Sequence, residues 1–206
     1  MLADIMRKLR IILFSFLFFS CNHRAEKQND NSSTPGERNY ATELIDNDFL
    51  KYADSSKVDS LKLQLTNSFN IYEEGNCKIA HIDAEELAEF SFNFFLPALN
   101  KILAKRNFTL SAQKLNKNDK SFDILINGDT LQLFTQHDLN NNTIWDTAPS
   151  NFFRKVNNLL KEKNNTEQFY LLYGGNDLFT LLLTDKEFSI ISDYYKDNEK
   201  EKPRKP

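Results

Sequence analysis

Residues 136–143 form the most polar segment within the folded part of the chain, and their side-chain types come closest to chemistry. His137 and Asp138 are the residue types of an acid–base pair, in which a carboxylate orients an imidazole that moves a proton. Adjacent side chains seldom converge on one substrate, however, and a general base must lie within hydrogen-bond reach of its proton. A hydrolase that uses this pair is therefore an alternative hypothesis.

The same segment has part of the spacing of a calcium-binding loop. Asp138, Asn140 and Asn142 match the first three ligand positions of such a loop. Thr143 stands where the sharp turn needs glycine, and Pro149 stands where the loop needs a bidentate glutamate. We therefore predict a solvated loop without a metal ion.

Other catalytic signatures are missing from the sequence. It contains no Gly-x-Gly-x-x-Gly pattern and no Walker loop, and Gly174-Gly175 is typical of a turn. Cys77 and His81 combine a thiol with an imidazole, but an extended chain holds them apart along a strand. We predict no catalytic residue and no cofactor, and we expect Cys77 to be a small buried side chain or a free thiol.

The charge balance argues against one class of partner. The 206 residues carry a formal net charge of −3, and without the first twenty residues 23 basic and 28 acidic side chains remain. A mildly acidic protein is a poor ligand for nucleic acid, because phosphate binding needs a basic face. The same balance is compatible with a basic protein partner.

The N-terminal residues have the organisation of an export signal. A basic stretch, Met6–Arg10, precedes an apolar run, Ile11–Phe19, which only Ser15 interrupts. Positive residues stay on the cytoplasmic side during insertion and orient such a segment. The run has about nine residues, and a membrane-spanning helix needs roughly twenty. We therefore predict a signal segment that is removed.

The end of this segment resembles the lipobox of bacterial lipoproteins. The residues are Leu17-Phe18-Phe19-Ser20-Cys21, with a small residue before the cysteine and Phe18 at the position that is usually aliphatic. The resemblance implies that residues 1–20 form a type II signal peptide and that Cys21 carries a diacylglyceryl thioether. Two or three acyl chains anchor a protein stably to a membrane, here one of the bacterial cell envelope. Residues 21–39 lack large apolar side chains, which favours a flexible tether.

Short patterns follow the tether. Residues 41–53 favour a helix, and residues 78–82 favour a strand. Leu61, Leu63 and Leu65 alternate with polar residues, which predicts a second strand with one wet face.

Capping residues and prolines mark the longer helices. Asp83 is a good N-cap for a largely buried helix, which Pro97 should kink or split. Pro149 is predicted to open another helix, because proline favours the first turn. Thr184 and Glu187 have the spacing of a capping box for a final helix.

Two hairpins are predicted in the second half of the chain. Asn127-Gly128 accepts the positive φ angles of a type I′ turn, and the register that it sets places Ile124 opposite Leu131. Residues 169–173 and 178–183 are apolar on both faces, so their hairpin should lie centrally, covered above and below. A further strand is expected over residues 108–115.

These elements predict an α+β fold, with an antiparallel sheet built from two hairpins plus additional strands and packed by about three helices. The folded domain is expected over residues 40–197. Residues 198–206 are charged, and we expect this tail to be frayed.

A small acidic domain on a lipid tether resembles, in organisation only, the envelope-anchored immunity proteins that block a toxin. The sequence therefore favours a protein-binding module over an enzyme. Acidic loop residues and an aromatic anchor are the predicted contacts to a basic partner. They are Asp138, Trp145, Asp146 and Asp177. An accessory lipoprotein of an envelope assembly is a further alternative.

Overall fold

The structure, a computed structural model, describes residues 39–115 and 122–206, which belong to one compact unit. The signal segment, Cys21 and nearly all of the tether lie outside the described residues. The fold is α+β, as the sequence predicts.

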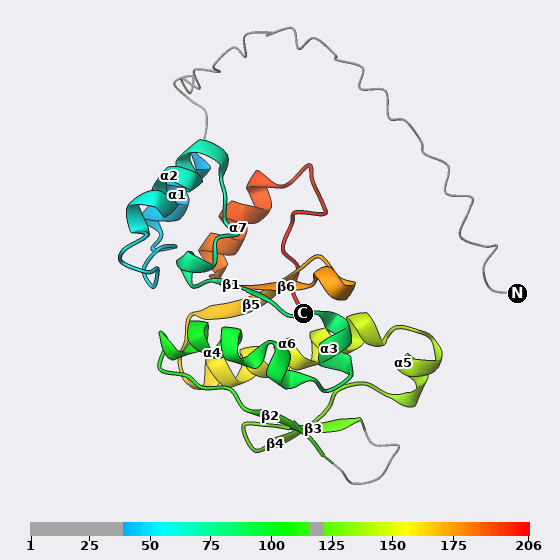
Figure 1. The fold of residues 1–206 in the computed structure, drawn as a ribbon. Helices are drawn as coiled ribbons and strands as arrows, with labels where there is room; N and C mark the ends of the chain where they lie inside the picture. The colour runs from blue at the N-terminus through cyan, green and yellow to red at the C-terminus, as the bar shows by residue number, and fades with distance from the viewer. Residues whose placement is uncertain (1–38, 116–121) are drawn as a thin grey trace, which may run out of the picture. The chain divides into compact units, whose positions relative to one another are not determined.

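Seven α-helices and six strands make up the described part of the chain (Figure 1). The helices are α1 (Tyr40–Asp46), α2 (Val58–Ser68), α3 (Ala84–Ala88), α4 (Leu96–Ala104), α5 (Gln136–Asn140), α6 (Ile144–Glu162) and α7 (Asp185–Tyr194). The strands are β1 (Ile79–His81), β2 (Ala112–Lys114), β3 (Asp123–Ile126), β4 (Asp129–Gln132), β5 (Glu167–Leu172) and β6 (Phe179–Thr184). Short 3-10 turns add η1 (Glu74–Asn76), η2 (Phe92–Phe94) and η3 (Gly175–Asp177).

The strands form two separate antiparallel sheets. Sheet A has the order β1-β6-β5, and sheet B has the order β2-β3-β4. Helices α3, α4 and α6 lie between the sheets, and α1, α2 and α7 cover the other face of sheet A (Figure 1). The sequence predicts an antiparallel sheet built from both hairpins, and the structure divides its antiparallel strands between two sheets because the helical layer separates the hairpins.

The β5–β6 hairpin is central, as predicted, and its alternating side chains serve two hydrophobic cores. Phe169 and Leu182 belong to the core shared with the middle helices. Tyr170, Leu181 and Leu183 belong to the core beneath α1, α2 and α7. Full burial of each such side chain contributes about 1.5–3 kcal/mol, so the hairpin holds both layers together.

The Asn127-Gly128 hairpin has the predicted register. Ile124 pairs with Leu131 across β3 and β4. Asn127 and Gly128 both have positive φ, at 48° and 91°, as a type I′ turn requires. Local sequence is therefore sufficient to specify this part of sheet B.

The predicted helix after Asp83 is split, and its cap is confirmed. The Asp83 carboxylate accepts hydrogen bonds from the backbone N–H groups of Glu85 and Glu86 at the start of α3. The chain then leaves the helix, and Pro97 lies in the first turn of α4, where its missing N–H has no cost. The capping box of Thr184 and Glu187 opens α7, also as predicted.

The leucine alternation was misread as a strand. Leu61 and Leu65 are buried on one face of helix α2, whereas Leu63 is 60% exposed. A helix places positions i and i+4 on one face and turns position i+2 away. Phe69, the next residue in the i, i+4 series, is buried and caps the helix in a left-handed conformation.

Two further boundaries differ from the predictions. Helix α6 begins at Ile144, so Pro149 lies inside it. Ile144 and Ala148 are buried and extend the apolar stripe of the helix toward its start. The C-terminal tail is not frayed, because Arg204 and Leu171 exchange two backbone hydrogen bonds of 2.8 Å at the outer edge of β5.

Candidate functional site

Asp138, a predicted partner-binding residue, caps its own helix. Its carboxylate accepts hydrogen bonds from the backbone N–H and the hydroxyl of Thr135, at 2.8 and 2.5 Å. The Thr135 hydroxyl in turn accepts from the N–H of Asp138, which completes a capping box. These hydrogen bonds, first of all the one from the Thr135 hydroxyl, hold the pKa of Asp138 below its ordinary value. Its carboxylate therefore stabilises the start of helix α5.

His137, the imidazole of the alternative hydrolase hypothesis, is exposed on the same short helix. Its Nε2 lies 2.9 Å from the side-chain amide nitrogen of Asn141, one turn later. The two cavities described below are lined by other residues.

The other predicted contact residues lie on two segments. Trp145 is 37% exposed, and both it and Asp146 are in the first turn of α6. The carboxylate of Asp146 lies 3.7 Å from the guanidinium of Arg204, so the ordered tail reaches this region. Asp177 is exposed in η3, the connection between β5 and β6.

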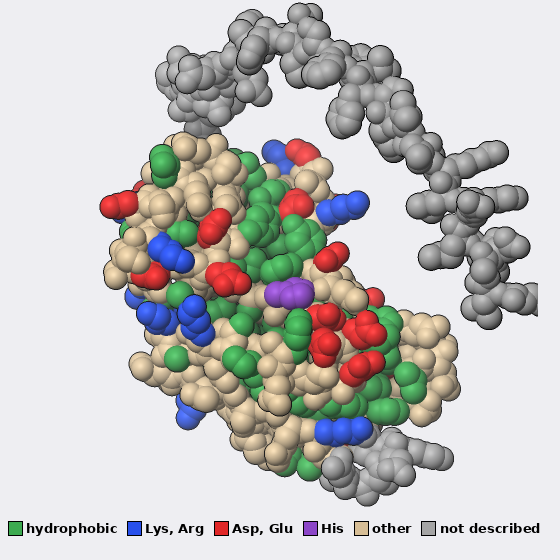
Figure 2. All heavy atoms as spheres, in the orientation of Figure 1, with side chains coloured by type: hydrophobic (Ala, Val, Ile, Leu, Met, Phe, Trp, Pro, Cys, Tyr) green, Lys and Arg blue, Asp and Glu red, His purple; other side chains and the backbone are tan. Residues whose placement is uncertain are grey.

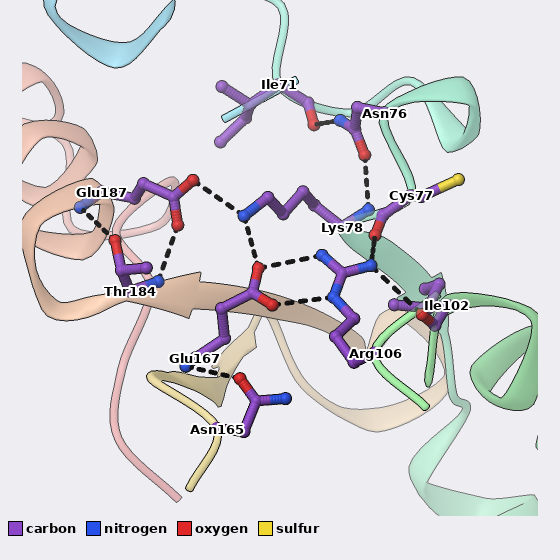
Figure 3. Close-up of polar contacts among 10 residues, drawn as sticks. All are labelled: Ile71, Asn76, Cys77, Lys78, Ile102, Arg106, Asn165, Glu167, Thr184 and Glu187. Carbon is purple, nitrogen blue, oxygen red and sulfur yellow. Dashed lines mark hydrogen bonds and ion pairs between the residues drawn. The ribbon is translucent and has the colours of Figure 1, made fainter. Parts of the chain in front are cut away.

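A buried cluster of four charged residues, which the sequence does not predict, lies at one end of sheet A (Figure 3). Lys78 Nζ donates to Glu167 at 2.6 Å and to Glu187 at 2.8 Å. Arg106 donates to both carboxylate oxygens of Glu167, at 2.7 and 2.9 Å. Each of these side chains is at most 6% exposed. No local pattern marks them, because they come from four distant segments.

The charged cluster is saturated by its own contacts. Nζ of Lys78 also lies 5.6 Å from the ring centroid of Phe49. The second oxygen of Glu187 accepts from the backbone N–H of Thr184. Burial works to raise the pKa of Glu167, but Arg106 and Lys78 outweigh it, and the pKa lies below its ordinary value. Two positive and two negative groups with these contacts form a structural centre.

The larger of the two described cavities, about 250 Å³, lies where helices α4 and α6 end. Lys105 and Lys163 line it, and they are the C-cap residues of the two helices. Cations are favourable at helix C-termini, where carbonyl groups remain unpaired. The position of the two lysines in this cavity is therefore explained by their interaction with the helix ends.

The second cavity is a groove of about 170 Å³ between β1 and α4. Its lining is Glu74, Cys77, Ile79, Ala80, His81, Phe94, Ala98, Lys101 and Ile102. The Cys77 side chain points away from the charged cluster (Figure 3), and the residue is 5% exposed. Within the described residues, no hydrogen bond joins its thiol to His81, and no group of three metal-ligating side chains is found.

Beside this groove, aromatic rings extend across the surface from His81. The imidazole lies 4.8 Å from the ring centroid of Phe179 and 5.8 Å from that of Phe94. Its Nε2 lies 2.8 Å from the carbonyl oxygen of Asn176, which can only accept, so Nε2 carries the proton. Phe94 is 51% exposed, unusually so for a large aromatic side chain. We call His81, Phe94, Phe179 and the groove the aromatic surface.

Acidic side chains flank the aromatic surface. Asp83 follows β1 by two residues, Glu85 is exposed in the first turn of α3, and Asp177 adjoins the carbonyl that His81 contacts. Figure 2 shows a histidine beside hydrophobic side chains, with acidic side chains clustered over α3. Among the predicted contact residues, Asp177 is the one that the described contacts place at this surface, because the preceding residue, Asn176, contacts His81. The sequence feature that could have indicated this surface is His81, which stands at the end of a short strand and was interpreted only as a possible partner of the Cys77 thiol.

Comparisons with known proteins give no relative. No protein-family model matches the chain, and no curated protein or solved structure matches it significantly.

Proposed function

We propose that this chain is a bacterial lipoprotein, anchored to an envelope membrane by lipid on Cys21, whose domain binds a protein partner without catalysis. The anchor rests on the lipobox-like sequence before Cys21. None of the helices in the described residues has the length and apolar character to cross a bilayer. The observation that carries the binding role is the half-exposed Phe94 at the edge of the groove.

An exposed aromatic ring beside a concavity has the properties of an interface anchor. Aromatic side chains are enriched among the residues that dominate binding energy, and these cluster where partners are packed and desolvated. The aromatic surface combines such a ring with a groove of about 170 Å³. The acidic residues beside it favour a basic partner, because opposite charge accelerates encounter and discriminates against other proteins.

An inhibitor of a toxin is the form of this function that we favour. A tether, a compact binding domain and an acidic surface suit a protein that captures a basic toxin at the membrane. Its contacts would be those of the aromatic surface together with Asp177. Asp138, Trp145 and Asp146 remain proposed contacts on helices α5 and α6.

Binding is tested by comparing two substitutions of exposed apolar residues. Tagged full-length protein is purified from detergent-solubilised envelopes as wild type, Phe94→Glu and Leu63→Glu, and the recovered proteins are quantified. Leu63 is the matched control, because it is exposed on α2. We expect a partner that Leu63→Glu retains and that Phe94→Glu weakens about thirtyfold, as for a side chain worth about 2 kcal/mol. Recovery that does not depend on Phe94 would contradict the proposal.

Lipid attachment has a separate test. Cells that express the chain are grown with radiolabelled palmitate, and we expect wild type but not Cys21→Ala to become labelled. Equal labelling of the two proteins would show that Cys21 is not the attachment site.

A further inference from the structure

We infer that the groove of the aromatic surface accepts an arginine or lysine side chain of a basic protein partner. The aliphatic stem would lie in the groove, and the charged head would lie at Glu74. This inference deepens the proposed function and rests on it.

The walls of the groove suit a long aliphatic stem. Ile79 and Ile102 are buried beneath it, while Ala98 and Phe94 are exposed at its side. Lysine and arginine can bury their methylene groups against such apolar walls while the charged head stays in water. The volume of about 170 Å³ has room for one side chain and is too small for a folded element.

The charges at the groove favour a cation. Glu74 lines the groove, is exposed, and makes no ion pair within the described residues. Lys101 lines it too and is the single lysine or arginine in the lining. Asp83, Glu85 and Asp177 add carboxylates near the His81 end of the groove, in the segments that follow β1 and precede β6.

The aromatic ring at the His81 end of the groove adds a separate attraction for a cation of the partner. A guanidinium or ammonium is attracted to the face of an aromatic ring within about 6 Å of its centroid. The chain already uses this contact elsewhere, since the guanidinium carbon of Arg106 lies 4.0 Å from the ring centroid of Tyr52. Phe94 offers an exposed ring for an equivalent contact with a partner.

Cys77 provides a reporter for the occupied groove, because its residue is part of the lining. The rate at which N-ethylmaleimide alkylates Cys77 is measured in the full-length protein, and the tryptic peptide that contains Cys77 is quantified by mass spectrometry. The probes are acetyl-Gly-Arg-Gly-amide and matched tripeptides with citrulline, norleucine or glutamate in the central position.

We expect the arginine peptide to slow alkylation of Cys77 and the citrulline and glutamate peptides to leave it unchanged. Glu74→Gln should raise the half-protecting concentration about two- to fivefold, the range for loss of an exposed ion pair. Lys101→Gln removes a positive charge from the same lining, and it should lower the half-protecting concentration. If Cys77 reacts too slowly in the native protein, Ala98→Cys places a more exposed reporter in the same groove.

Several outcomes would overturn the inference. Protection by the norleucine peptide equal to that by arginine would assign the groove to an apolar side chain, and protection by glutamate would assign it to an anion. Absence of any protection of both reporters would show that the groove takes no side chain of this kind. In that case a partner that still depends on Phe94 would leave the proposed function standing, so the two failures are distinguishable.

Discussion

The guanidinium of Arg106 forms a bidentate ion pair with the carboxylate of Glu167, with Nε 2.7 Å from Oε2 and Nη2 2.9 Å from Oε1. The remaining donors of Arg106 reach the backbone carbonyls of Cys77 and Ile102. This arrangement joins the end of α4 to the first residue of β5 and to the segment that leads into β1. It fixes the middle helices against one end of sheet A.

Removal of Lys78 should destabilise the protein strongly. Lys78→Ala leaves Glu187 and Glu167 buried with a missing partner, and breaking a buried ion pair costs about 3–5 kcal/mol. Urea unfolding measures the loss. Lys186→Ala is the control, because Lys186 pairs with Glu43 at the surface and is 55% exposed, and it should cost about 1 kcal/mol or less. Similar losses for the two variants would contradict the structural role of the cluster.

The buried cluster predicts sensitivity to acid. Because the pKa of Glu167 lies below its ordinary value of 4.5, the folded state binds this proton less tightly than the unfolded state does. The stability that Glu167 contributes is therefore complete above about pH 4.5 and is lost as the pH falls through the folded pKa. The difference in unfolding free energy between wild type and Glu167→Gln should shrink between about pH 5 and pH 3. A difference that is constant with pH would show that the pKa is unshifted.

The C-terminal tail should contribute to stability through Glu201. Its carboxylate accepts a hydrogen bond from Tyr173 at 2.6 Å and another from Tyr72. Glu201→Ala should cost about 1.5–3 kcal/mol, the range for a hydrogen bond to a charged group. Glu199→Ala is the matched control, since Glu199 is 81% exposed and forms a surface ion pair with Lys202. Thermal unfolding compares the variants, and equal melting temperatures would indicate a frayed tail.

The leucines of residues 61–65 distinguish a helix from a strand. In helix α2, Leu65→Ala removes a buried side chain and should cost about 2–5 kcal/mol. Leu63→Ala changes an exposed position and should alter stability by about 0.5 kcal/mol or less. A strand would place both leucines on one face, so comparable losses in urea unfolding would favour the strand.

Local signals predicted the parts of the fold that local sequence controls. Asn127-Gly128 specified both a turn and its register, and Thr184 with Glu187 specified the start of α7. Leu61 and Leu65 fit either period, and the helix prevails because Phe69 continues the i, i+4 series into the core. The separation of the two sheets depends on packing between residues far apart in the chain, which a short stretch of sequence does not reveal.

The candidate site was less predictable than the fold. Asp138 drew attention as an acidic loop residue, but its position three residues after Thr135 makes it a helix cap. The largely buried helix predicted after Asp83 would include Phe94, and the exposure of Phe94 follows from the break in that helix before Pro97. A site residue that is marked only by its exposure becomes visible once the tertiary structure is known.

The central position of β6 also determines when the domain can fold. Lys78 and Glu187 are 109 positions apart, and β1 has its only strand partner in β6 among the described strands. During synthesis, residues 79–81 leave the ribosome long before residues 179–184 exist. Neither hydrophobic core can close until then, because both require side chains of β6. A partly made chain therefore stays open, which would suit the export that we propose.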